Sequence, residues 1–381
     1  MKKFIALALA SVMTFSLAAC GGGGSDEAAV AGTPISGDTI KIGVFEPTTG
    51  ENGGGGMQEV LGIRYANTVA PTVDINGTTY NIELVEVDNQ SDKTAAVTAA
   101  QSLISSGVVG VLGSYGSGVS IAAGQTFAEA GVPAIGCSCT NPQVTAAKNY
   151  FRMCFLDPFQ GTVLANYAWE HGSKKAYCLS KMGDDYSVGL VNYFADAFKK
   201  LGGTVVEEQF EQGNSDFAAY VANAKKNGCD VFFSPVSTEA AALIINQAQS
   251  QKLGMPILAS DTWDSNVITG AAKGTDLEII VTTFYQEGGD PEFDKGIKAW
   301  IEGDKTNLAN NGGNSELAAV TAMGYDAYFV ALEAMKAAGS TDPADILAAL
   351  PSLEVSDLVC GDVSFNDVGD ANKTEAFVKK C

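Results

Sequence analysis

The sequence predicts an α/β fold of two doubly wound, Rossmann-like lobes that face each other across a cleft. Its 381 residues, 46% of them hydrophobic, exceed what one compact domain uses. From Thr39 onward, short β-rich runs alternate with helical patterns, which is typical of parallel α/β architecture. This alternation occurs twice, over about 39–157 and 158–283, so we expect two lobes of the same kind.

Each predicted element follows from a local pattern. Strands are predicted at 39–45, 80–88, 108–113, 132–136, 175–180, 204–210, 230–235, 256–260 and 277–284. Helices are predicted between them, for example at 94–107, 187–203 and 215–228, and several end in glycine, which suits a helix C-cap.

A long helical segment at 315–339 follows the ninth strand and fits an addition to the first lobe. The chain then crosses between the lobes more than once, through a hinge of several crossovers. We expect 39–157 plus about 284–356 in lobe 1, and 158–283 plus about 357–381 in lobe 2. A ligand cleft is expected at the carboxyl ends of the strands.

The N-terminus has the pattern of an export signal. Residues 1–19 combine a short basic region with an apolar stretch too short for a comfortable membrane span. Leu17 to Cys20 resembles the lipobox of bacterial lipoproteins, which implies lipidation of Cys20; an ordinary secreted signal is the alternative. The glycine-rich segment 20–38 is expected to be a flexible tether. We therefore expect an exported protein, lipid-anchored to the outer face of the bacterial cytoplasmic membrane.

Composition disfavours several function classes. A formal charge of −21 with only 23 Lys and Arg leaves no basic face for nucleic acid. Seven cysteines follow Cys20, without the spacing of a zinc ribbon, and there is one histidine, so no metal site is expected. That histidine, His171, lies beside Gly172 at an apparent helix C-terminus, where interaction with terminal carbonyls explains it. A Ser-His-Asp or Cys-His enzyme is therefore disfavoured.

A glycine-rich turn follows the strand at 108–113. The spacing of Gly113, Gly116 and Gly118 has the wrong order for a dinucleotide fingerprint, and the chain contains no P-loop, so we expect no cofactor. Backbone N–H groups at the start of the next helix, with the hydroxyls of Ser114, Ser117 and Ser120 nearby, favour a small anion such as a carboxylate. A turn that only packs the helix is the alternative.

The stretch IGCSCTNPQVT, residues 135–145, follows the next strand and reaches the same sheet edge. Ser138 and Thr140 supply hydroxyls, and the backbone at Cys139 supplies a donor and an acceptor. Cys137 and Cys139 are expected on one face of an extended segment, at the limit of separation for a disulfide. A two-thiolate metal site would need further ligands, and the spacing suggests none.

Four stretches now carry a family resemblance: GCSCTNPQVT, FRMCFLDPFQGTVLANY, the SYGSG turn and SDTWDSN. They resemble the leucine, isoleucine and valine binding proteins of ATP-driven amino-acid importers, the type I extracytoplasmic solute-binding family. The resemblance covers nearly the whole mature chain. It implies a Venus-flytrap receptor that clamps a free amino acid between its lobes and passes it to an ABC permease in the membrane.

The resemblance also implies residue roles. Ser117 and Thr140, with the backbone around Ser138 and Cys139, would hold the α-carboxylate. Asp261, with a backbone carbonyl near Cys139, would meet the α-ammonium, and the Tyr186 hydroxyl would close from the second lobe. This agrees with the chemistry of a zwitterion, which needs donors on one side and a carboxylate on the other.

Two positions depart from the family pattern. Gly55 lies where relatives often have a bulky aromatic residue, and Ser237 or Thr238 lies where tyrosine is common. Both changes remove volume, so we expect a ligand larger or more polar than leucine, an aromatic amino acid being one example. Tyr115 is a further pocket-wall candidate, while Trp263 either walls the pocket or packs beneath the following helix.

The function expected from the sequence is therefore non-enzymatic capture of an amino acid by a lipid-anchored receptor for import. A sensory receptor of the same fold and, less favoured, an exported α/β enzyme are the alternatives.

Overall fold

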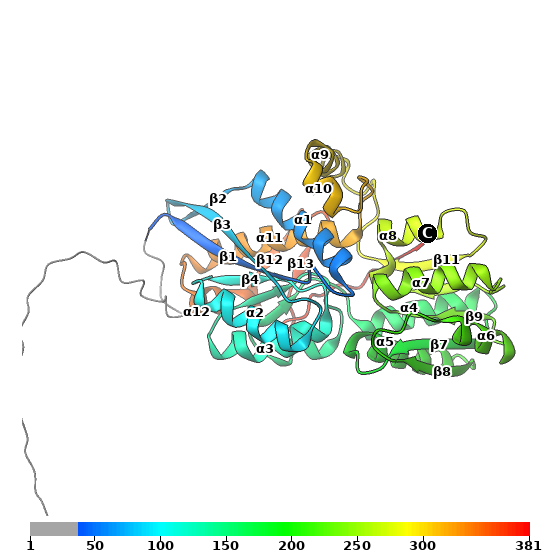
Figure 1. Ribbon diagram of the computed structural model, residues 1–381. Coiled ribbons are helices and arrows are strands. Elements are labelled where there is room, and N and C mark those ends of the chain that lie inside the picture. Colours follow the sequence, from blue (N-terminus) through cyan, green and yellow to red (C-terminus); the bar gives the residue numbers. More distant parts are fainter. Residues whose placement is uncertain (1–36) are drawn as a thin grey trace, which may run out of the picture.

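The computed structural model describes residues 37–381 as two lobes that lie side by side (Figure 1). The expected signal peptide, Cys20 and nearly all of the tether lie outside the described residues. Within 37–381, no helix has the length and apolar character needed to cross a membrane.

The first lobe is built on a six-stranded sheet in the order β2-β3-β1-β4-β5-β6. All neighbouring strands are parallel except β2, which pairs antiparallel with β3. The strands are β1 (Thr39–Glu46), β2 (Thr72–Ile75), β3 (Thr78–Asp88), β4 (Gly110–Leu112), β5 (Ala134–Gly136) and β6 (Tyr150–Arg152).

Helices cover both faces of this sheet. One face packs on α2 (Lys93–Ser105) and α3 (Ser117–Glu129), around Leu103 and Phe127. The other packs on α1 (Gly53–Val69), α11 (Ala319–Ala338) and α12 (Pro343–Ala349). The remaining helices and strands of this lobe are η1 (Pro142–Ala146), α9 (Pro291–Gly303), α10 (Lys305–Asn310), η3 (Leu350–Ser352), β12 (Glu354–Val355) and β13 (Val363–Ser364).

The packing of α1 against α11 depends on two glycines. A Cβ at Gly62 would lie 1.9 Å from the carbonyl oxygen of Thr321, and one at Gly324 would lie 2.3 Å from the carbonyl oxygen of Glu59. Only glycine allows this close backbone approach. The late helical segment, α11, therefore packs on the first lobe.

The second lobe repeats the architecture with the order β14-β11-β10-β9-β7-β8. Its strands are β7 (Lys175–Lys181), β8 (Thr204–Phe210), β9 (Val231–Phe233), β10 (Ile257–Ala259), β11 (Ile279–Thr283) and β14 (Phe377–Lys380). One face packs on α4 (Asp157–Glu170) and α5 (Asp185–Lys200). The other packs on α6 (Ala218–Lys226), α7 (Thr238–Ser250), η2 (Asp261–Trp263) and α8 (Asn266–Ala272).

The chain crosses between the lobes three times: from β6 to α4, from β11 to α9, and into β14, which pairs antiparallel with β11. The last crossing falls later than the expected residue 357. β13 pairs with β12, and Phe365 lies in the core of the first lobe. Asp370 is bridged to Arg152 on β6. The chain therefore leaves the first lobe only after about residue 371.

Candidate functional site

The carboxyl ends of the two parallel sheets meet at a cleft between the lobes. A cavity of about 210 Å³ lies there, lined by Glu51, Asn52, Ser91, Asp92, Lys93, Tyr115, Gly116, Ser117, Gly118 and Val119 of the first lobe and Lys181, Met182, Gly183, Asp184, Tyr186, Gln212, Ser237 and Thr262 of the second. Four residues singled out in the sequence line it: Tyr115, Ser117, Tyr186 and Ser237.

The lobes contact each other around this cavity. The Tyr115 hydroxyl donates to the carbonyl of Thr262 at 3.2 Å. The Asn141 side-chain amide donates to the carbonyl of Asp185 at 2.8 Å, and Lys93 Nζ lies 2.7 Å from an Asp185 carboxylate oxygen. The arrangement is that of a closed clamp.

The first lobe presents hydroxyl groups at two neighbouring turns. Ser117 is the first residue of α3, where the initial N–H groups have no partner within the helix. Its Oγ accepts from the backbone N–H of Asn141 at 3.3 Å, which leaves its proton available to a ligand. Thr140 is fully buried, and its hydroxyl has no hydrogen-bond partner among residues 37–381. Both hydroxyls can donate to a carboxylate.

The second lobe presents a carboxylate at the end of β10. Tyr186 Oη donates to Asp261 Oδ1 at 2.7 Å, and the Asp261 amide donates to Gln160 Oε1 at 2.9 Å. Asp261 Oδ2 accepts no hydrogen bond from the described residues. Burial raises the pKa of Asp261 to about 6, although the hydrogen bond from Tyr186 acts to lower it. The group is therefore ionised at neutral pH and can receive an ammonium.

Ser138 and Cys139 point their side chains away from the cleft. The Ser138 hydroxyl donates to Glu59 Oε2 at 2.5 Å. The Cys139 carbonyl accepts a hydrogen bond from Arg152 Nη1 at 3.1 Å. The Cys139 thiol packs against the backbone of Gly136, where an added Cβ would lie only 2.4 Å from the sulfur. Only the backbone of these two residues remains for a ligand.

The expectation that Cys137 and Cys139 share one face was wrong. Cys137 packs in the core with α1 and α11, whereas Cys139 packs in the core with α2 and α3, on the other side of the sheet. The cysteines at 137, 139, 154, 178, 229, 360 and 381 are all free.

The volume at Gly55 is filled by an aromatic side chain from another element. A Cβ at Gly55 would lie 2.4 Å from Tyr115 Cζ, so the Tyr115 ring packs directly on α1. The expectation that Gly55 removes aromatic cover was therefore wrong. Since a tyrosine supplies that cover, Gly55 no longer argues for a ligand larger than leucine.

Trp263 packs in the core of the second lobe. It is fully buried, and its indole N–H donates to the carbonyl of Val236 at 3.1 Å. Of the two alternatives, packing is therefore correct and the pocket-wall role is not. Ser237 caps α7, where its hydroxyl accepts from the Ala240 amide at 3.4 Å, and also lines the cavity.

The sequence reasoning assigned no role to three buried polar residues in FRMCFLDPFQG. Arg152 lies 2.6 Å from Asp370 and is fully buried. Burial raises the pKa of Asp157 to about 8, so this carboxyl is protonated at neutral pH. Gln160 positions Asp261, as described above. The sequence did carry a signal for these residues: polar and charged side chains inside an apolar stretch are buried only where they have a partner.

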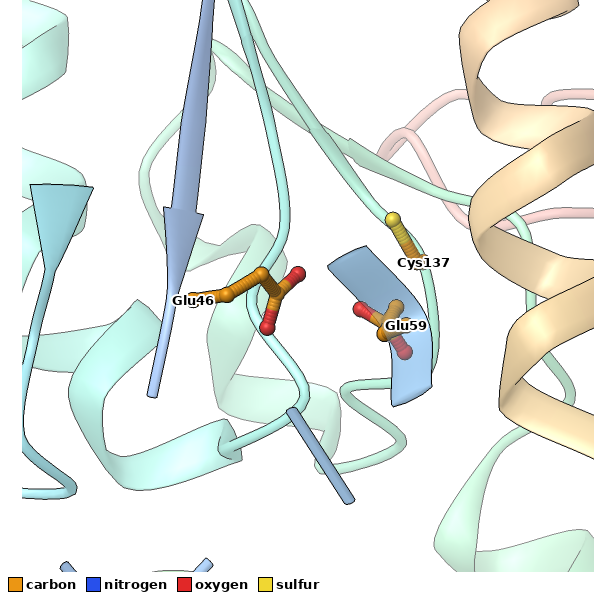
Figure 2. Close-up of side chains that lie close together, drawn as sticks. All are labelled: Glu46, Glu59 and Cys137. Carbon is orange, nitrogen blue, oxygen red and sulfur yellow. The ribbon is translucent and has the colours of Figure 1, made fainter. Parts of the chain in front are cut away.

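Glu46 and Glu59 were also missed. Their carboxylates and the Cys137 thiol form the one group of potential metal ligands among residues 37–381, with ligand atoms within 4.8 Å of one another (Figure 2). The metal-site question raised by Cys137 and Cys139 therefore moves to a different set of side chains.

Two lobes that close over a polar cleft, with hydroxyl donors on one side and a carboxylate on the other, define a clamp-type solute-binding protein. The chain belongs to the periplasmic binding protein family, whose model matches residues 39–378.

Relatives and solved structures agree with this assignment. The Leu/Ile/Val-binding protein homolog 1 of Brucella abortus is 30% identical over 335 residues, covering 87% of each chain. A leucine binding protein from Thermotoga maritima is 32% identical, with a TM-score of 0.79 over 89% of this chain and 94% of that one. The substrate-binding protein of a Streptococcus pneumoniae branched-chain amino acid transporter, in complex with isoleucine, is 25% identical, with a TM-score of 0.77 over 90% and 100%.

Proposed function

We propose that this protein captures a free amino acid outside the cytoplasm and delivers it to an ABC permease, without catalysis. One observation carries the proposal: Ser117 and Tyr186 line the cavity from opposite lobes, with Ser117 beside the turn that holds Thr140 and Tyr186 bonded to the Asp261 carboxylate. A zwitterion complements this arrangement, because its carboxylate needs donors and its ammonium needs an anionic acceptor.

Branched-chain amino acids are the ligand class we propose first. The relatives described as Leu/Ile/Val-binding and the neighbour solved with isoleucine support this choice. The Tyr115 ring packed on Gly55 also supports an apolar side chain of moderate size. The one histidine supports binding rather than chemistry, since His171 stacks on Tyr167 at the exposed end of α4.

A thermal-shift screen against the twenty amino acids tests the proposal. A ligand at about 100 times its Kd stabilises the folded state by roughly 2.7 kcal/mol, which raises the unfolding temperature by several degrees. We expect leucine, isoleucine or valine to give the largest shift. A screen in which no amino acid moves the transition contradicts import of this class, and a largest shift with phenylalanine or tyrosine restores the larger-ligand hypothesis.

The lipid anchor is a separate proposal, supported by the sequence Leu17 to Cys20 and the glycine-rich segment after it. Several buried acyl chains, at roughly 0.8 kcal/mol per methylene, would hold the protein at the membrane. We expect the wild type to incorporate a labelled fatty acid and Cys20→Ala to incorporate none. Equal incorporation by both proteins, or none by the wild type, contradicts lipidation of Cys20.

A further inference from the structure

Two glutamates lie buried behind the ligand-binding turns of the first lobe and face each other (Figure 2). Glu46 ends β1, and Glu59 lies on α1 one turn after Gly55. Their exposed fractions are 1% and 0%. The fold leaves room for this pair, because a Cβ at Gly113 would lie 2.4 Å from Glu46 Oε1.

Each carboxyl group holds one of the two turns. Glu46 Oε2 accepts from the Tyr115 amide at 2.7 Å and from Ser114 Oγ at 3.4 Å. Glu59 Oε2 accepts from the Ser138 hydroxyl at 2.5 Å. Tyr115 lies two residues before Ser117, and Ser138 lies two residues before Thr140. The positions of both proposed ligand contacts therefore depend on Glu46 and Glu59.

The other oxygen of each carboxyl group has no partner. Oε1 of Glu46 and Oε1 of Glu59 are buried without a hydrogen bond from residues 37–381. Two charged carboxylates enclosed so close together would repel each other strongly. One proton on Glu46 removes this repulsion and supplies a donor to Glu59, which satisfies both oxygens at once.

The surrounding groups leave this proton in place at neutral pH. Burial, then the charge of Glu59, raises the pKa of Glu46 well above its ordinary value. The titratable groups facing the pair are Cys137, Cys139, Tyr115 and Tyr150, and burial raises the pKa of each, so all are neutral. Arg152, the cation beside Cys139, is committed to Asp370 and to backbone carbonyls.

We propose that Glu46 and Glu59 share one buried proton, and that this proton holds the two ligand-binding turns of the first lobe in register. Both glutamates are then positioning residues that act through Tyr115 and Ser138. This inference rests on the proposed function. Loss of the proton at alkaline pH places two charges in one enclosed site, so the turns separate and ligand affinity falls.

The proton can be tested without any ligand. We expect infrared spectra of the purified wild type at neutral pH to contain the carbonyl band of a buried protonated carboxyl, and the band to weaken in Glu46→Gln. The folded state retains the proton and the unfolded state loses it, so stability should decrease as the pH rises above about 5. Per pH unit, the folding equilibrium constant of the wild type should fall by up to tenfold more than that of Glu46→Gln. Identical spectra and identical slopes overturn the proposal.

Binding supplies the second test, by calorimetry with L-leucine, L-isoleucine and L-valine from pH 6 to 10. Glu46→Gln and Glu59→Gln each place an amide N–H where the shared proton lies. We expect both to bind within about threefold of wild type at pH 7 and to lack its alkaline loss of affinity. Glu46→Ala, which removes the acceptor for Tyr115, should bind at least tenfold more weakly. The exposed Glu354→Gln is the control and should keep the wild-type profile.

The possible failures are distinguishable. If no amino acid binds, the proposed function fails, while the infrared result still decides whether the proton is present. If Glu46→Gln keeps the alkaline loss, or if purified wild type contains stoichiometric metal that Glu46→Gln lacks, the shared proton is refuted.

Discussion

At the scale of single residues, the proposed function predicts that ligand affinity depends most directly on the Asp261 side chain. Asp261→Asn keeps the shape of the site but removes the charge that would meet an ammonium. Truncating one partner of a buried, hydrogen-bonded charge pair costs about 2–5 kcal/mol of binding free energy. We expect calorimetry to find the affinity for leucine or its best analogue reduced by at least thirtyfold, with an unchanged circular dichroism spectrum. The exposed Asp276→Asn should bind as wild type, and equal affinities for both variants would remove Asp261 from the site.

The protonation of Asp261 also predicts an acid limit to binding. Its pKa of about 6 means that the carboxylate is mostly charged at pH 7 and is protonated as the pH falls below 6. The ligand ammonium keeps its charge over this range, so affinity should fall by up to tenfold per pH unit below about pH 6. Calorimetry between pH 4 and 7 measures this slope. A flat profile over that range would show that another group receives the ammonium.

The contact between Gly55 and Tyr115 can be tested with an adjacent glycine as control. Gly55→Ala places a Cβ against the Tyr115 ring, whereas a Cβ at Gly54 would lie 3.8 Å from its nearest neighbours. We expect Gly55→Ala to displace the ring, lower the free energy of unfolding by about 1–3 kcal/mol, the usual cost of overpacking, and weaken ligand binding, while Gly54→Ala folds and binds as wild type. In a Tyr115→Ala background, Gly55→Ala should cost much less, as a double-mutant cycle would show. Additive effects would mean that the two residues act separately.

The sequence was informative about residues whose role is local. Ser117, Thr140 and Asp261 follow strand ends, so the sequence predicts them near the cleft; Ser117 lines the cavity, and the ligand contacts of all three stay predictions. The ring of Tyr115 fills a volume on a helix 60 positions earlier in the chain, and the Glu46–Glu59 pair unites a strand with a helix. Such contacts depend on the packing of separate elements, which periodicity does not encode.

At the scale of elements, the contact between α1 and α11 explains why a helix so late in the chain belongs to the first lobe. Gly62→Ala would press a Cβ onto the backbone carbonyl of Thr321, which cannot move without shifting the helix. We expect a loss of about 3 kcal/mol in the free energy of unfolding, despite the roughly 1 kcal/mol by which alanine favours a helix. Chemical denaturation measures it.

Gly270→Ala is the matched control for this helix pair. Gly270 lies inside α8, and a Cβ there would meet no atom within 4 Å. The substitution should therefore stabilise the protein slightly, by up to about 1 kcal/mol. Equal effects of the two substitutions would mean that α1 and α11 are not held in close backbone contact.

The predicted elements were confirmed where the pattern was long and periodic. All nine predicted strands and the helix at 315–339 are present, with ends shifted by a few residues. β2 was missed, although Asn76 and Gly77, both at positive φ, are a recognisable hairpin signal. β6, β12, β13 and β14, of two to four residues, were also missed, whereas the equally short β4, β5, β9 and β10 were predicted because each lies within a longer run rich in apolar residues.

At the scale of the whole molecule, two lobes could be predicted because the strand–helix alternation repeats. The position of the last crossing could not. Residues up to about 371 are held in the first lobe by the pair of Arg152 with Asp370, whose partners are 218 residues apart. No local composition change marks that pair, so the boundary expected at 357 came too early.

Closure of the clamp depends on contacts between lobes, and the ion pair of Lys181 with Glu51 joins their rims at the cavity. Both side chains are mostly buried, so the pair should stabilise the closed state by somewhat more than the 0–1 kcal/mol of an exposed pair.

Lys181→Glu places two like charges there and should weaken amino-acid affinity by about tenfold, while the exchange Glu51→Lys with Lys181→Glu should recover most of it. Lys199→Glu, which breaks an exposed ion pair with Glu207 inside the second lobe, is the control and should leave affinity unchanged. Small-angle scattering should then show that saturating ligand compacts the wild type and the exchanged pair, but compacts Lys181→Glu less. If Lys181→Glu binds and closes like the wild type, this ion pair contributes nothing to closure, and the apolar and hydrogen-bonded contacts around Tyr115 and Asn141 hold the lobes together.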